Sequence, residues 1–199
     1  MEKINYDKKL ENIINELEHK PKLLLHSCCG PCSSYVINYL KDYFDITILY
    51  YNPNIEPKEE YEKRKKEQLR LISEIKLNNV DFYDMDYDNE TYKELVEEYT
   101  QDKEGGIRCH KCYELRLNKT ADIAKNNGYE YFGTTLTVSP YKNAQVLNEL
   151  GEKLGEIYNL RWLYSDFKKK EGYKKSIEIS QKYNLYRQNY CGCLYSKNS

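Results

Sequence analysis

The sequence predicts an α/β protein with one domain built on a doubly wound, mostly parallel sheet that carries helices on both faces. Two observations support this prediction. Short apolar runs of strand length alternate with longer amphipathic stretches of helical period, and turn residues separate them. Strands that alternate with helices in this way favour parallel pairing through right-handed crossovers.

The amino-terminal 20 residues read as a helical extension of this domain. Leu10, Ile13, Ile14 and Leu17 follow the i, i+3, i+4, i+7 spacing, which predicts a helix over 7–19 that Pro21 closes. The remainder, 21–199, reads as the α/β domain with a cysteine-bearing carboxyl-terminal tail.

Within the domain, the apolar runs predict five strands, over 23–25, 45–51, 79–85, 129–135 and 161–164. Between them, Gly30-Pro31 reads as the turn that ends the first strand, with a helix opening at Ser33 and Ser34. Further helices are predicted over about 57–77, after a cap at Asp88 or Asn89, from Ile107 to Gly128, behind Ser139 as N-cap with Pro140 at N1, and over 172–183.

The seven cysteines stand in three groups, and the spacing of each indicates chemistry rather than packing. Three follow the first strand at the start of a helix, where ligands bind in open α/β sheets; they are Cys28, Cys29 and Cys32. Cys109 and Cys112 share one face of a first helical turn. The last two lie in the tail, at Cys191 and Cys193.

The compartment expected for the chain bears on these thiols. The amino terminus is charged and lacks the apolar core of a signal peptide, and no apolar run approaches the roughly 20 residues of a membrane span. We therefore expect a cytoplasmic protein whose thiols stay reduced, so that metal or redox chemistry is favoured over a disulfide framework.

Several chemistries fit the thiols when the residues are considered alone. Cys29-Gly30-Pro31-Cys32 matches the Cys-x-x-Cys of thiol–disulfide oxidoreductases. Four thiolates from the first two groups suit a structural Zn²⁺, although an iron–sulfur cluster accepts the adjacent Cys28 and Cys29 more easily. The tail pair is interpreted as a reversible electron relay, as further metal ligands or as idle thiols.

Charge alone does not identify a partner, because the net charge is −1. Ten acidic residues fall within 81–104 and seven Lys or Arg within 160–182. A basic face opposite an acidic one is compatible with RNA binding, and solvated helix faces explain it nearly as well.

Six segments, in the same order along the chain, together resemble the epoxyqueuosine reductase family of the QueH type over about residues 21–195. The segments are 26–32 (HSCCGPC), 51–55 (YNPNI), 108–116 (RCHKCYELR), 135–142 (TLTVSPYK), 166–169 (DFKK) and 190–193 (YCGC). The resemblance implies a Rossmann-like, adenine-nucleotide-hydrolase-like catalytic domain that reduces epoxyqueuosine to queuosine at the wobble position of a tRNA anticodon.

The resemblance also implies roles for individual residues. The positions that match [4Fe-4S] ligands are Cys28, Cys29, Cys109 and Cys112, and Cys32 is a candidate additional ligand. The positions that match a redox-active disulfide are Cys191 and Cys193. An additional iron ion is a second candidate cofactor, the electron donor is a separate partner of unknown identity, and no membrane is involved.

Substrate contacts are a hypothesis drawn from position in the sequence. His26, Tyr141 and Lys142 flank the cysteine loop or lie in the hydroxyl-rich loop, and Lys168 and Lys169 begin a basic run suited to tRNA phosphates. Two readings from other classes remain open: a zinc-stapled RNA-binding module, and a thiol–disulfide oxidoreductase that uses Cys29 and Cys32.

Overall fold

The computed structural model describes residues 4–75 and 80–197. These residues form a five-stranded sheet in the order β3-β2-β1-β4-β5, in which every adjacent pair is parallel. The strands are β1 (Lys22–His26), β2 (Asp45–Leu49), β3 (Val80–Tyr83), β4 (Tyr131–Thr134) and β5 (Arg161–Trp162). The predicted α/β fold with a parallel sheet is confirmed.

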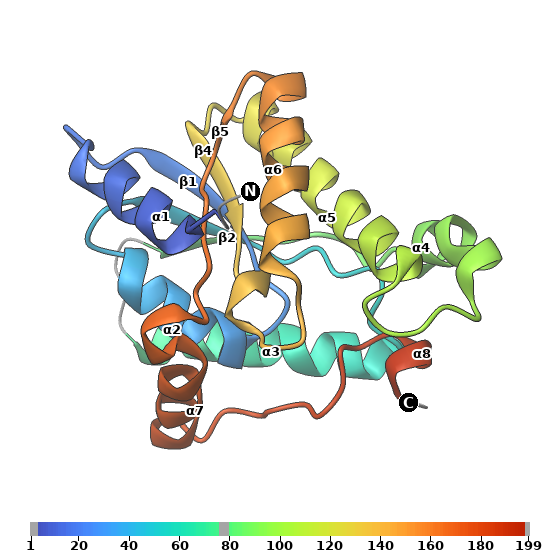
Figure 1. Ribbon diagram of the computed structural model, residues 1–199. Helices are drawn as coiled ribbons and strands as arrows, with labels where there is room; N and C mark the ends of the chain where they lie inside the picture. The colour runs from blue at the N-terminus through green and yellow to red at the C-terminus, as the bar shows by residue number, and fades with distance from the viewer. Residues whose placement is uncertain (1–3, 76–79, 198–199) are drawn as a thin grey trace.

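Helices connect the strands and cover both faces of the sheet (Figure 1). The α-helices are α1 (Tyr6–Asn15), α2 (Gly30–Leu40), α3 (Lys58–Glu74), α4 (Asn89–Val96), α5 (Ile107–Asn126), α6 (Ala144–Tyr158), α7 (Gly172–Lys182) and α8 (Leu194–Lys197). Short 3-10 turns lie at η1 (Glu97–Tyr99), η2 (Leu136–Val138) and η3 (Lys169–Glu171).

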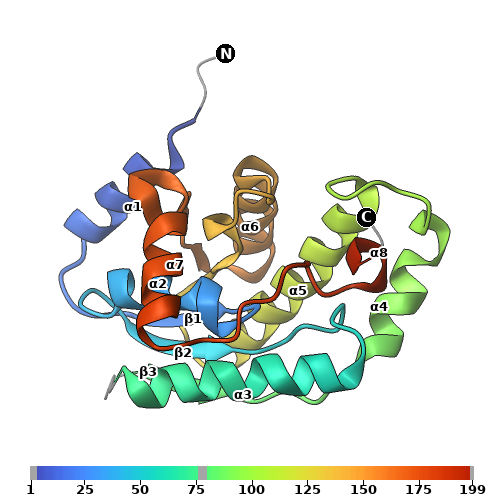
Figure 2. The ribbon, with the colours of Figure 1, turned by 90° about the horizontal axis from the view of Figure 1, so that it is seen from below.

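The alternation of side chains along β1 divides the core into two apolar layers. Leu23 and Leu25 pack with residues of α2 on one face, together with Leu10 of α1. Leu24 points the other way, into a layer formed with residues of α5 and α6. Figures 1 and 2 show this arrangement, with α2, α3 and α7 on one side of the sheet and α5 and α6 on the other.

Several predicted elements are shorter in the structure than the sequence pattern indicated. The helix predicted over 7–19 ends at Asn15, and the strand predicted over 161–164 ends at Trp162. The predicted ends at 76–77 of one helix and at 79 of one strand lie outside the described residues. Two predicted caps are confirmed: Asp88 accepts the amide of Thr91 at the start of α4, and Gly128 follows α5 with a φ of +70°.

The prediction that Gly30-Pro31 forms a turn before the helix is wrong, because α2 begins at Gly30. Proline is tolerated in the first turn of a helix, where its missing N–H would have no helical partner. The Ser33 and Ser34 hydroxyls donate to the carbonyls of Gly30 and Pro31, at 3.0 and 2.8 Å. Cys29 is therefore the N-cap residue, and Cys32 lies inside the first turn.

The predicted cap at Ser139 and Pro140 is also wrong. Helix α6 begins at Ala144, and its N-cap is Asn143, whose side-chain oxygen accepts the amides of Gln145 and Val146. Residues 139–142 instead form a turn in which the Ser139 hydroxyl accepts the Tyr141 amide. As a result, the Tyr141 side chain stands out from the surface, with 76% of the residue exposed.

Candidate active site

A cavity of about 450 Å³ lies at the carboxyl edge of the sheet, where β1 and β4 end. The loop after β1, the loop after β4, helix α7 and the carboxyl-terminal tail all contribute to its wall. Its lining includes Cys28, Cys32, Glu104, Arg116, Tyr141, Lys142, Tyr173, Arg187, Gln188, Asn189, Tyr190 and Cys191. Chain segments that are far apart in the sequence therefore meet at one site.

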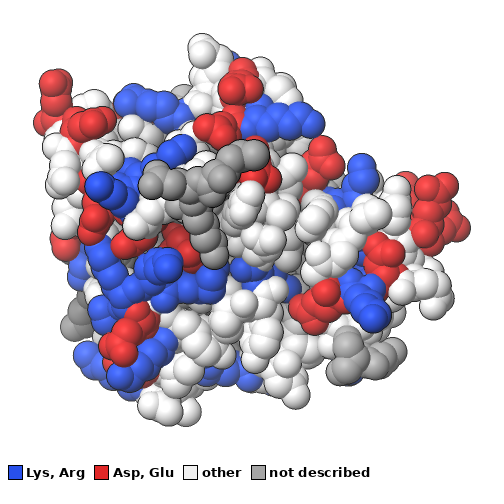
Figure 3. Space-filling model, in the orientation of Figure 1, with Lys and Arg blue, Asp and Glu red and all other residues white. Residues whose placement is uncertain are grey.

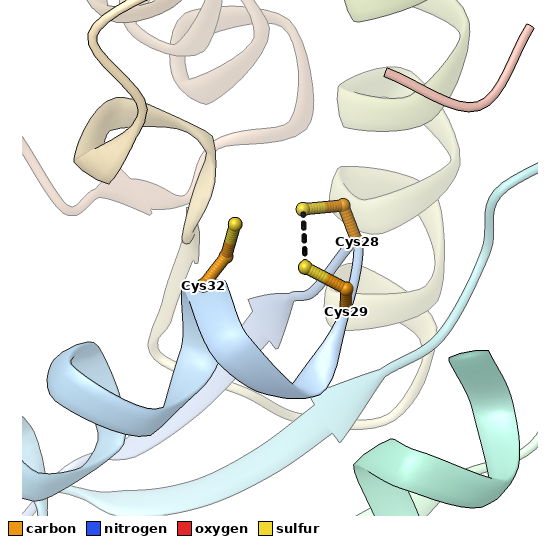
Figure 4. Close-up of side chains that lie close together, drawn as sticks. All are labelled: Cys28, Cys29 and Cys32. Atoms are coloured by element: carbon orange, nitrogen blue, oxygen red, sulfur yellow. Dashed lines mark hydrogen bonds between the residues drawn. The ribbon is translucent and has the colours of Figure 1, made fainter. Parts of the chain in front are cut away.

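The cysteine loop, residues 28–32, brings three sulfur atoms together at the start of α2. The Sγ atoms of Cys28, Cys29 and Cys32 all lie within 4.8 Å of one another, and the Cys28 thiol donates to Cys29 Sγ at 3.7 Å. Figure 4 shows the three side chains converging on a shared space beside the end of β1. Such a set can hold a metal ion or three corners of a metal–sulfur site.

The three thiols of this loop differ in acidity because they bond to one another. Hydrogen bonds from Cys28 and Cys32 lower the pKa of Cys29 well below its usual range, and the Gln188 amide adds a further donor at 2.9 Å. The hydrogen bond with Cys29 raises the pKa of Cys28, and hydrogen bonds with Cys28 and then Cys29 raise the pKa of Cys32 well above its usual range. Cys29 is thus the most readily ionised sulfur of the loop.

The second cysteine group lies on the first turns of α5. Cys109 Sγ accepts the Gly105 amide at 3.2 Å, while Cys112 is buried against Tyr92, Val96 and Cys193. Burial raises the pKa of the Cys112 thiol to about 12, so this sulfur stays protonated at neutral pH unless a cation binds it.

Arg116 connects the two groups from the next turn of α5. Its side chain is 1% exposed, and its guanidinium donates to His26 Nε2 at 3.2 Å, to Asn52 Oδ1 at 2.7 Å and to Cys112 Sγ at 3.9 Å. Asn52 in turn donates to the Ser27 carbonyl at 2.8 Å. We call Arg116, His26, Asn52 and Cys112 the Arg116 network; it ties the ends of β1 and β2 to α5.

His26 is the neutral member of this network. Burial, followed by the charge of Arg116, lowers the pKa of His26 to about 3. His26 Nε2 lies 3.2 Å from Arg116 Nε and 3.1 Å from the Tyr51 carbonyl oxygen, and Nδ1 lies 2.9 Å from the Thr134 hydroxyl. His26 lies behind the cavity wall and is not among its lining residues.

The tail places its two cysteines in different surroundings. Lys142 Nζ lies 3.2 Å from Cys191 Sγ and 3.1 Å from Glu104 Oε1, inside the cavity. Burial lowers the pKa of Lys142, but the charges of Cys191, Tyr113 and Glu104 and the hydrogen bond to Cys191 together raise it by more. Cys193 is buried, and its sulfur lies 3.5 Å from the Ser196 hydroxyl. Both cysteines are free thiols in the structure.

Backbone contacts hold the tail against the loop that follows β2. The Glu56 amide donates to the Gly192 carbonyl at 2.9 Å, and Arg64 Nη1 donates to the Cys191 carbonyl at 3.0 Å. The Tyr190 hydroxyl donates to the Glu56 carbonyl at 3.1 Å. These contacts fix Cys191 at the cavity.

The predicted site residues separate into those that the cavity joins and those that it does not. The cavity joins Cys28, Cys32, Tyr141, Lys142 and Cys191. Its lining does not include Cys29, Cys109, Cys112, Cys193, His26, Lys168 or Lys169. The thiols among these are buried behind or beside the wall, so direct contact with a substrate in this cavity is not available to them in this conformation.

The basic run at the start of α7 is partly engaged within the protein. Lys168 pairs with Asp166 at 2.9 Å and donates to two carbonyls, while Lys170 pairs with Asp7 and Glu11 of α1. Lys169 is exposed. Figure 3 shows Lys and Arg side chains gathered over α7 and the segment before it, and acidic side chains toward α4.

Sequence reasoning assigned no role to Arg116 and Gln188. Arg116 stands four residues after Cys112 and seven after Cys109, which places all three on one helix face, so this spacing was an available signal. Gln188 lies in an irregular segment and no spacing marks it.

A larger hollow, about 940 Å³, lies at the amino ends of β4 and β5. Its lining residues include none of the seven cysteines, and its charged groups include the exposed pair Arg161 and Glu130. The chemistry of the chain is therefore at the carboxyl edge, despite the smaller volume there. No helix in the described part of the chain has the length and apolarity that a membrane crossing requires.

Comparison with known proteins agrees with the geometry of this edge. The family model described as epoxyqueuosine reductase QueH matches residues 23–199. A protein of Staphylococcus epidermidis named epoxyqueuosine reductase QueH is 45% identical, over 98% of this chain and 85% of its own length. A Thermotoga maritima protein of the same name is 34% identical, over 87% of this chain and 89% of its own. The chain belongs to the epoxyqueuosine reductase QueH family.

Proposed function

We propose that this protein reduces the epoxide of epoxyqueuosine in tRNA to give queuosine. The observation that carries the proposal is the cavity in which a free thiol, a buried ammonium group and the cysteine loop face one another. The names of its relatives support the same reaction. Because the substrate is tRNA, we expect the reaction to take place in the cytoplasm.

We infer that the thiols hold a [4Fe-4S] cluster. The proposed ligands are Cys28, Cys29, Cys109 and Cys112, with Cys32 as an additional donor that could hold a further iron ion. The donor set fits an anionic metal–sulfur group: three sulfurs converge, and the buried Arg64 Nη2 has no hydrogen-bond partner among the described residues. When bound, such a cluster supplies electrons, commonly one at a time.

Loss of the epoxide oxygen as water breaks two C–O bonds, forms a C=C bond and consumes two electrons and two protons. Lys142 is the protein group that we place at the departing oxygen, because its ammonium lies in the cavity beside Cys191. Glu104 accepts a hydrogen bond from Lys142 and can relay a proton to it. These two side chains account for proton supply within the cavity.

Cys191 and Cys193 are proposed as a dithiol that stores two electrons. Oxidation of two thiols to a disulfide releases two electrons and two protons, which matches the demand of the reaction. Only Cys191 lines the cavity, so the pair can form after Cys193 leaves its buried position beside Ser196. A separate reductant must then restore the dithiol.

Recognition of tRNA is proposed for the rim of the cavity and the adjacent basic surface. Tyr141 is exposed at the rim and offers a face on which an unpaired base can stack. Phosphate contacts are proposed for the basic residues that follow β5, namely Lys168, Lys169, Lys170, Lys174 and Lys175. Affinity for tRNA should then fall as salt concentration rises.

The experiment that tests the proposal is a metal analysis of protein purified without oxygen, followed by turnover of tRNA that carries epoxyqueuosine. We expect about four irons and four acid-labile sulfides per chain, with a visible band that dithionite bleaches. One zinc and no iron would contradict the cluster. Full turnover after replacement of both Cys109 and Cys112 by serine would instead favour thiol–disulfide chemistry at Cys29 and Cys32.

A further inference from the structure

Arg116 is a fully buried cation with no carboxylate partner among the residues that the structure describes. Its three acceptors are an imidazole, an amide and a cysteine sulfur, from His26, Asn52 and Cys112. The sulfurs around it are that of Cys112, which its guanidinium contacts at 3.9 Å, and those of Cys28 and Cys191, which line the same cavity as Arg116.

Two other arginines of the chain have carboxylate partners, which Arg116 lacks. Arg64, also 1% exposed, pairs with Glu60 at 2.7 Å. Arg70 pairs with Glu67 and Glu74 and donates to two backbone carbonyls at the end of α7. A buried charge without an opposite charge is strongly unfavourable, so Arg116 needs a negative group other than a carboxylate of the protein beside it.

We propose that Arg116 is the counter-ion of the metal centre that the cysteine loop and the α5 cysteines hold, and that it stabilises the centre and its reduced form. The proposal rests on the proposed function only in requiring a metal bound by thiolates. A metal centre with four thiolates, whether iron–sulfur or zinc, carries net negative charge, and Arg116 contacts the sulfur of Cys112 and lines the same cavity as Cys28. Reduction adds another negative charge, which a nearby fixed cation favours.

The surroundings of Arg116 hold its charge in place. His26 comes from the end of β1 and Asn52 from the segment after β2, so both acceptors are fixed by the sheet edge. Their dipoles orient the guanidinium without neutralising it. Arg116 thus acts through its charge on the metal centre.

The test compares Arg116→Gln, Arg116→Lys and the control Arg70→Gln, each purified without oxygen with its metal bound. Three quantities are measured: the rate at which a chelator in excess removes the metal, the midpoint potential in a dithionite titration, and the free energy of unfolding in urea with metal bound and after its removal. Among the described contacts Arg70 bonds to carboxylates and backbone carbonyls and to no sulfur, so its variant reports the structural effect of losing an arginine.

For Arg116→Gln we expect metal loss at least tenfold faster, and a tenfold smaller equilibrium constant for reduction, which is about 59 mV for one electron. The metal-free variant should be at least as stable as metal-free wild type, because an uncompensated buried charge is gone. Arg116→Lys should restore most of the slow metal release and most of the midpoint potential. Arg70→Gln should lower the free energy of unfolding equally with and without metal, and should change neither the rate of metal release nor the potential.

The proposal is overturned if Arg116→Gln lowers the stability of the metal-free and metal-bound proteins equally and leaves metal release unchanged. It is also overturned if Arg116→Lys behaves as Arg116→Gln does, since the charge would then not matter. If the bound metal is zinc, the cluster proposed above fails, but the release rates and the two stabilities still decide the role of Arg116.

Discussion

The cysteine loop and the tail each contribute closely spaced cysteines, yet they present them in opposite ways. In the loop, the Sγ atoms of Cys28, Cys29 and Cys32 lie within 4.8 Å of one another. In the tail, Cys191 faces Lys142 in the cavity while Cys193 is buried beside Ser196. The first arrangement gathers thiols for a shared ligand, and the second separates two thiols that are only one residue apart.

The difference has a structural origin. The loop lies between a buried strand and a helix N-terminus, so backbone geometry that is local to residues 26–33 aims its side chains. The tail has no regular structure from 184 to 193 and is held by contacts to Arg64, Glu56 and the loop after β2. Local geometry therefore sets the thiols of the loop, and long-range contacts set those of the tail.

The largest effect that we expect is a difference in metal retention between a cysteine variant of the loop and a cysteine variant of the tail. Cys28→Ser removes one of the converging sulfurs and should weaken metal binding by at least about 100-fold, beyond the 10- to 100-fold typical of outer-shell changes. Cys193→Ser, which alters a sulfur outside that set, should retain the metal. Metal content after gel filtration with chelator measures both, and equal losses in the two variants would remove the distinction between loop and tail.

A second prediction compares the backbone at a glycine of the tail, Gly192, with the backbone at a glycine of the cysteine loop, Gly30. Gly192 has a φ of +129°, and a Cβ there would lie 2.9 Å from Ile55 Cγ1 and 3.1 Å from Arg64 Nη1. Gly192→Ala should therefore lower the free energy of unfolding by about 1–3 kcal/mol and speed alkylation of Cys191. Gly30→Ala is the control, since its closest contact is 3.2 Å, to the Glu67 carbonyl, and its φ is not positive. Urea unfolding should show the smaller loss for Gly30→Ala; the reverse order would show that the loop is the more constrained backbone.

The same contrast explains what the sequence could predict. Apolar periodicity identified the strand before Cys28 and the helix that carries Cys109 and Cys112, because burial on a sheet or helix face leaves a regular pattern. It misplaced the start of α2, since Gly30-Pro31 is compatible with both a turn and a first helical turn. The convergence of three thiols depends on that choice.

Contacts between residues far apart in the sequence leave no periodic pattern from which they could be predicted. The pairing of Lys142 with Cys191, 49 positions apart, arises only after the tail crosses the sheet edge. The burial of His26 follows from its place at the end of the central strand, beneath Arg116. The substrate contact expected of His26 stays a prediction; in the structure its ring is fully buried and lies 3.2 Å from Arg116 Nε.

A third prediction concerns the pH dependence of the free energy of unfolding that arises from His26, which is buried beside the cysteine loop. The pKa of His26 is about 3 in the folded protein, below the 6.5 of an ordinary histidine. Between these values the unfolded chain binds a proton that the folded one does not, so stability is lost as pH falls from about 6.5 toward 3, by up to about 1.4 kcal/mol per pH unit.

His26→Gln should remove this dependence, and urea unfolding at several pH values measures it. His19→Gln is the matched control, because the His19 side chain is 67% exposed. If the free energy of unfolding of His26→Gln depends on pH as steeply as that of the wild type, acid acts on other groups. The region around the cysteine loop is then not the acid-sensitive part of the site.

The smallest effect that we expect lies at the hydrogen bond between the two regions. Gln188 of the tail donates to Cys29 Sγ at 2.9 Å, and this contact favours the ionised sulfur. Gln188→Ala removes one hydrogen bond, worth about 1 kcal/mol, so metal release to a chelator should become roughly fivefold faster. Asn189→Ala is the control, because Asn189 also lines the cavity but has no hydrogen bond to sulfur among the described contacts. If the two variants release metal at the same rate, the tail acts on the loop only by covering it; if Gln188→Ala alone is faster, the tail also sets the charge of the sulfur on which the loop depends.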